Sequence, residues 1–83
     1  MKEPLIFSIN HIVDRRETNA ERTASLLASM LYDMEEAAEK QDRDLDWATL
    51  KIEGRRPDIE EDGPAALLRG AVVFSARAQS VTE

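Results

Sequence analysis

The chain has 83 residues, 42% hydrophobic and 34% charged, and its aromatic residues are two phenylalanines, one tyrosine and one tryptophan. This composition excludes a disordered chain and indicates one small domain, residues 1–83, with a modest aliphatic core that a partner subunit could share. The net charge of -6 argues against general affinity for nucleic acid or anionic membranes, and the lack of cysteine excludes disulfides and thiolate metal sites.

The first predicted element is a strand at residues 5–14. Apolar side chains such as Leu5, Phe7 and Ile9 alternate with positions that include Ser8 and Asn10. This period of two is typical of a half-buried strand. The same apolar run is too short and too often interrupted to be a signal peptide or a membrane span. We therefore expect an intracellular protein that does not cross a membrane.

The second predicted element is a helix of about six turns that ends near Lys40. Thr18 and Glu21 stand three residues apart and match a capping box, in which each side chain accepts from the other residue's backbone N–H. Apolar residues then recur at steps of three and four, from Leu27 to Met34 and beyond, and no glycine or proline interrupts them.

Two further strands are predicted, at residues 47–54 and 67–79. In the first, Leu50 and Ile52 share one face with Ala48; in the second, Leu68 shares a face with Phe74, and Gly70 inside it indicates a bulge or a close backbone approach. The order β-α-β-β predicts an α+β fold, a two-layer sandwich in which one long helix packs on a three-stranded, mainly antiparallel sheet. The loop at residues 54–66 is longer than a hairpin needs, so we expect it to contact a partner.

A sheet covered by a single helix leaves a second face and two edges for a partner. We expect Ile12 and Ala71 on that second face, and we expect the arginine pairs at the element ends to form ion pairs across an interface. The predicted interface residues are Ile6, Trp47, Val73, Arg55 and Arg56.

Acidic residues concentrate at the end of the helix and in the segment after it. They form either a solvated helix face or a surface that meets a basic partner or repels DNA. Part of this segment matches a calcium-loop pattern, but Trp47 stands where the loop needs glycine, so we expect no metal site. The residues of the predicted acidic surface are Asp33, Glu35, Glu36, Glu39, Asp42, Asp44 and Asp46.

His11 is the only histidine of the chain. A general base needs a positioned partner, and no such partner, no phosphate-binding glycine motif and no metal-ligand spacing can be recognised. We expect a non-enzymatic protein with no catalytic residue and no cofactor.

Taken in order, the segments LIFSINHIVD, NAERTASLLASMLYDMEEAAE, DLDWATLKIEG and GAVVFSARAQ resemble the C-terminal portion of the tail terminator (tail completion) proteins of long-tailed bacteriophages and prophages. The resemblance implies a small α+β fold and a structural role in a ring, typically hexameric, that contacts other tail or connector proteins. It also implies assembly in the bacterial cytoplasm and a place in the virion.

One alternative stays open from the residues alone. A small acidic protein could inhibit a basic surface, for example as a phage-encoded inhibitor of a defence nuclease, by presenting the carboxylates of its helix. Neither reading predicts sequence-specific binding of nucleic acid.

Overall fold

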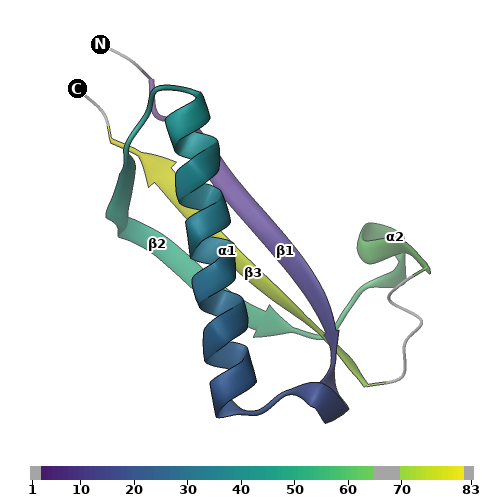
Figure 1. Cartoon of the computed structure of the whole chain (residues 1–83). Coiled ribbons are helices and arrows are strands. Elements are labelled where there is room, and N and C mark those ends of the chain that lie inside the picture. The colour runs from purple at the N-terminus through teal and green to yellow at the C-terminus, as the bar shows by residue number, and fades with distance from the viewer. Residues whose placement is uncertain (1–2, 65–69, 82–83) are drawn as a thin grey trace.

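The computed structural model describes residues 3–64 and 70–81 (Figure 1). The elements in chain order are β1 (Ile6–Asp14), the 3-10 turn η1 (Arg15–Glu17), α1 (Ala20–Lys40), β2 (Leu45–Arg55), α2 (Ile59–Asp62) and β3 (Ala71–Ser80). The predicted α+β fold, with a three-stranded antiparallel sheet and one long helix, is confirmed.

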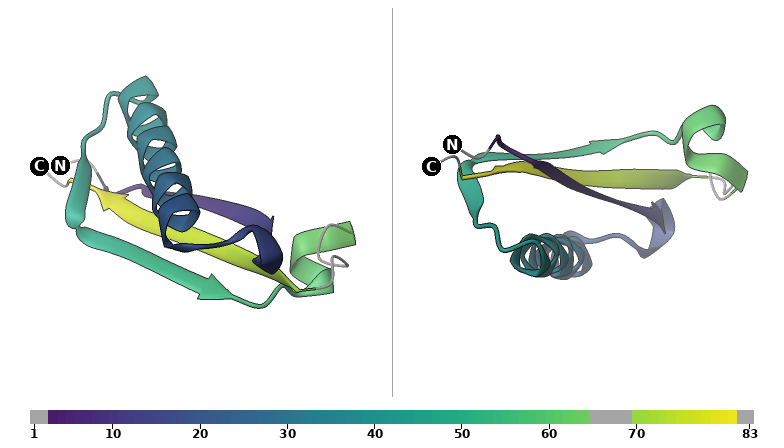
Figure 2. Two further views of the ribbon diagram at one scale, coloured as in Figure 1. Left: turned by 60° about the horizontal axis from the view of Figure 1, so that its bottom comes forward. Right: turned by 90° about the horizontal axis from the view of Figure 1, so that it is seen from above.

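The sheet has the order β1-β3-β2, so the last strand lies in its centre. β3 pairs antiparallel with both neighbours, from Ile6 opposite Gln79 to Asp14 opposite Ala71 on the side of β1. The predicted pairing of the last two strands is therefore confirmed. β1 and β2 are the two edges of the sheet, and α1 connects them in the chain. The helix therefore crosses from one edge to the other, and Figure 2 shows it lying against one face.

The core lies between α1 and this face of the sheet. Its buried members are Phe7, Met30, Met34, Ala38, Leu45, Ala76 and Ala78. The alanines of β3 leave room under the helix, and the two methionines fill it with long, adaptable side chains. Burying a methionine contributes about 1.5–3 kcal/mol, so this pair supplies much of the stability of so small a core.

The start of α1 differs from the predicted capping box. Asn19 is the N-cap, and its side-chain oxygen accepts from the N–H of Arg22 at 2.8 Å. Thr18 instead closes η1, because its hydroxyl donates to the carbonyl of Arg15 at 2.6 Å. The prediction was wrong because a turn precedes the helix and uses the threonine, so the helix begins one residue later with an equally good cap.

The connection from β2 to β3 is partly ordered. β2 runs through Arg55, and Ile59–Asp62 forms α2 inside the segment predicted as a loop, of which residues 65 and 66 lie outside the described part. Of the strand predicted at residues 67–79, residues 67–69, Leu68 among them, lie outside the described residues, and β3 runs from Ala71 to Ser80.

Gly70 is a turn residue and not a bulge within a strand. Its φ of 76° lies in the left-handed region that favours glycine, and its carbonyl accepts from the N–H of Arg15 at 2.9 Å. Gly70 thus aligns the start of β3 with the end of β1.

Candidate functional site

The face of the sheet that α1 does not cover carries mainly polar side chains. It is called the open face below. In register it pairs Ser8 with Arg77, Asn10 with Ser75, and Lys51 with Arg77. Figure 2 shows α1 on the opposite side of the sheet. The open face comprises Ile6, Ser8, Asn10, Ile12, Asp14, Asp46, Lys51, Glu53, Arg55, Ala71, Val73, Ser75, Arg77 and Gln79.

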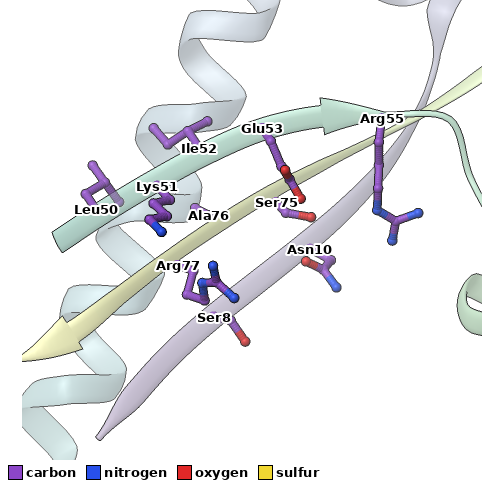
Figure 3. Close-up of a pocket in the computed structure, with 10 residues that line it drawn as sticks. All are labelled: Ser8, Asn10, Leu50, Lys51, Ile52, Glu53, Arg55, Ser75, Ala76 and Arg77. Carbon is purple, nitrogen blue, oxygen red and sulfur yellow. The ribbon is translucent and has the colours of Figure 1, made fainter. Parts of the chain in front are cut away.

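A hollow of about 700 Å³, open to solvent, lies on the open face (Figure 3). Arg77 lies between Lys51 and Ser8 in this hollow, and Glu53 lies beside Ser75. Hydroxyl, amide and cationic groups from all three strands therefore converge on one shallow surface. Such a surface can bind carboxylates or other anions through charge-assisted hydrogen bonds.

The cross-strand pair Lys51–Arg77 is unfavourable in the isolated chain. Like charges directly opposite each other on neighbouring strands destabilise a sheet, since their Cβ atoms are about 4.5–5.5 Å apart. Within residues 3–64 and 70–81, neither side chain takes part in an ion pair. An anion bound between them would remove this repulsion, which makes the pair the clearest candidate for a binding site.

Arg55, predicted as an interface residue, is held within the chain. Its two Nη atoms donate to the two carboxylate oxygens of Asp62 at 2.9 and 3.0 Å, and the N–H of Asp58 donates to the same carboxylate at 2.7 Å. The hydrogen bond from Arg55, followed by that from Asp58, lowers the pKa of Asp62 below its ordinary value. This pair ties α2 to the end of β2, whereas the neighbouring Arg56 is exposed.

Val73 is also unavailable to a partner. It lies on the side of the sheet opposite α1, as predicted, but it is 0% exposed within the single chain. Ala71 is buried at the same end, and Ile12 is half-buried opposite Val73. Ile6, at the other end of the open face, is 64% exposed, so it remains a candidate contact residue.

Trp47 lies on the side of α1 and not on the open face. Between Asp46 and Lys51 the register of β2 shifts, so that five steps along β2 oppose two along β3. Thr49 holds this bulge: its hydroxyl donates to the carbonyl of Asp46 at 2.7 Å and accepts from the N–H of Gln79 at 2.8 Å. The odd step count reverses the alternation, which is why the prediction for Trp47 was wrong.

The bulge creates a second hollow, of about 250 Å³, between β2 and α1. Its lining includes Tyr32 and Glu35 of the helix together with Trp47. Tyr32 is 72% and Trp47 45% exposed, so both aromatic rings reach solvent at the outer side of α1.

Only some of the residues of the predicted acidic surface lie together in the structure. Asp33, Glu35, Glu36 and Glu39 are exposed on α1, where Glu36 also pairs with Lys40 at 3.6 Å. Asp46 lies apart from them in β2 and accepts from the N–H of Ala48 at 3.1 Å, so it stabilises the bulge.

Asp42 and Asp44 are exposed in the segment between α1 and β2. Among the described residues, no three histidine or acidic side chains cluster closely enough to hold a metal ion.

His11 is exposed on β1, opposite Phe74 and on the side of α1. In the described part of the chain no hydrogen bond links it to a carboxylate or a hydroxyl group. The structure therefore places it away from the hollow of the open face.

The residues that sequence reasoning missed are Lys51 and Arg77. Each was recognised as an exposed strand residue, but their approach depends on the register of β2 against β3. The bulge sets that register, and no residue pattern in the segment predicts how long the bulge is.

A scan against protein-family models, a search of curated proteins and a search of solved structures each found no match to this chain. Among the residues that the structure describes, no helix is long and apolar enough to span a membrane.

Proposed function

We propose that this chain is a non-enzymatic assembly subunit that forms a homo-oligomer and uses the open face to contact its neighbour. The observation that carries the proposal is the pair Lys51–Arg77, two cations that oppose each other over a solvent-open hollow and have no ion-pair partner within the described part of the chain. A neighbouring subunit that supplies carboxylates there would convert a repulsion into two charge-assisted contacts.

Within this proposal, the chain acts like a tail terminator protein of a long-tailed phage or prophage. Support comes from the order of elements in the resemblance, a strand, a long helix and two strands, which matches the order of β1, α1, β2 and β3. The subunits would then form a ring, typically hexameric in that family, on other tail and connector proteins. The ring would assemble in the bacterial cytoplasm and afterwards belong to the virion. Figure 1 shows the α2 segment extending beyond one end of the sheet, where it can reach another tail protein without taking part in the contact between copies of this chain.

The first test is the native mass by light scattering over a concentration series, at low and high ionic strength, with electron micrographs of the main species. We expect an oligomer that weakens as salt screens the contact, and closed rings in the micrographs. A chain that stays monomeric at the highest concentration and lowest salt would refute the self-assembly. Oligomers that never close into rings would refute the tail terminator role.

The exposed carboxylates of α1 favour a second candidate function, the inhibition of a basic protein surface. Glu35 and Glu39 lie one turn apart and carry no ion pair within the described residues. A monomer that blocks nucleases of a test panel, and that loses this ability on Glu35→Lys and Glu39→Lys substitution, would support this function in place of the first.

A further inference from the structure

We propose that copies of this chain associate head to tail, with the open face of one copy seated on the outer face of α1 of the next. This inference rests on the proposed self-assembly and names its contact. The outer face of α1 is the exposed stripe of residues Glu21, Ser25, Ala28, Tyr32, Glu35, Glu36 and Glu39.

The charges of the two surfaces are complementary. The outer face of α1 carries four glutamates; Glu36 is paired with Lys40 at 3.6 Å, and the other three have no ion-pair partner within the described residues. In the hollow of the open face, Lys51 and Arg77 outnumber the single carboxylate of Glu53, since Arg55 is already paired with Asp62. Docking the helix on the sheet would thus relieve two repulsions at once, one among glutamates and one between the two opposed cations.

The dimensions of the two surfaces also agree. α1 has 21 residues, which corresponds to a length of about 31 Å at 1.5 Å per residue. β3 has 10 residues, which corresponds to about 33 Å at 3.3 Å per residue. Three strands span about 10 Å between the outer two, the diameter of one helix with its side chains.

The size of the contact sets its strength. A footprint of about 30 by 10 Å belongs to the small end of protein interfaces. We therefore expect each contact to depend strongly on concentration and salt, and a closed assembly to gain stability from the number of its contacts.

A symmetric contact between two open faces is less favourable. Each copy would bring Lys51 and Arg77 to the interface with only Glu53 to compensate them, so cations would be in excess on both sides. A head-to-tail contact uses two different surfaces, and it repeats until the subunits close a ring or extend a filament. In an open filament, one open face and one helix face stay unused, one at each end; in a closed ring, none does.

The test is a charge exchange between the two surfaces. Lys51→Glu with Arg77→Glu makes the open face acidic, and Glu35→Lys with Glu39→Lys makes the outer face of α1 basic. We expect each double variant to lose at least tenfold in association constant. The fourfold variant, which keeps the net charge of -6, restores complementarity with exchanged signs and should associate again.

The matched control is Glu60→Lys with Glu61→Lys on α2, which changes the net charge as the helix variant does but lies on neither surface. It should keep the association of the wild type. None of the four side chains changed in the helix and control variants lies in the core, since Glu35, Glu39, Glu60 and Glu61 are exposed, so circular dichroism should show unchanged folding.

The outcomes separate this inference from the function on which it rests. Normal association of the helix variant, or failure of the fourfold variant to associate, overturns the head-to-tail contact while self-assembly stands. A monomeric wild type overturns the self-assembly itself. Trp47, the only tryptophan, lines the hollow beside Glu35, so its emission should shift on dilution of the wild type and stay constant in the helix variant.

Discussion

Met30 is the position at which the fold is most sensitive to the loss of a side chain. It is 1% exposed and belongs to a cluster in which Ala38, Ala76 and Ala78 are also buried. Met30→Ala removes three heavy atoms beyond Cβ, and the small alanines around the site cannot expand into the void. Substitutions of this kind cost about 2–5 kcal/mol, and the limited collapse here favours about 3 kcal/mol. A chain of 83 residues has a total stability of about 4–12 kcal/mol, so the variant should remain folded but only marginally.

The assay is equilibrium unfolding in urea, followed by circular dichroism at low protein concentration. With a slope of about 1.2 kcal/mol per molar urea, the midpoint should fall by about 2.5 M with no change in slope. Tyr32→Ala is the control on the same helix, since Tyr32 is 72% exposed and its loss should change the stability by less than about 0.5 kcal/mol. A loss below about 1 kcal/mol for Met30→Ala, or equal losses for the two variants, would refute the assignment of this helix face to the core.

Three further predictions concern local contacts. Asn19→Ala should cost about 1 kcal/mol by thermal or urea unfolding, and Glu21→Gln much less, because Asn19 and not a capping box begins α1; the reverse order would contradict the cap. Gly70→Ala should cost about 1–2 kcal/mol in the same assay. The cost comes from its φ of 76° and not from a clash, since an added Cβ would meet nothing closer than 3.9 Å. An unchanged midpoint would show that this backbone conformation is not required. Asp62→Asn should flatten the dependence of stability on pH. The lowered pKa of Asp62 means that its contribution is present above the unfolded-state pKa of about 3.9 and is lost as pH falls through the folded-state pKa, so wild type and variant should differ most in unfolding midpoint above that unfolded-state value and converge in acid. A gap that widens in acid would contradict the sign of that shift.

The elements and the buried face of α1 could be predicted from the sequence because each depends on local periodicity. Met30 and Met34 stand four residues apart in an uninterrupted helical pattern, and Phe7 stands two residues from Ile9 in a strand pattern. Both signals come from the burial of one face, and the structure buries or partly buries those residues.

The central place of β3 could not be predicted in the same way. The sequence shows that a strand follows a long connection, but not that it inserts between β1 and β2. The reason for alanine at positions 76 and 78 is visible only from that position, where both residues lie under α1 and are fully buried. Small side chains are needed there because the helix packs closely above them, and a local sequence pattern does not predict that packing.

The bulge in β2 decides the chemistry of both surfaces. Strict alternation would have set Trp47 on the same face as Lys51, and the open face would then have carried an exposed aromatic ring. The shift held by Thr49 moves that ring beside α1 and leaves the open face to hydroxyl, amide and charged groups. A contact on such a face is held by charge-assisted hydrogen bonds and is weakened by salt, whereas a contact through an apolar face would be strengthened by it. The response of the oligomer to sodium sulfate, which screens charges but favours apolar burial, therefore reports which of the two kinds of contact the bulge has produced.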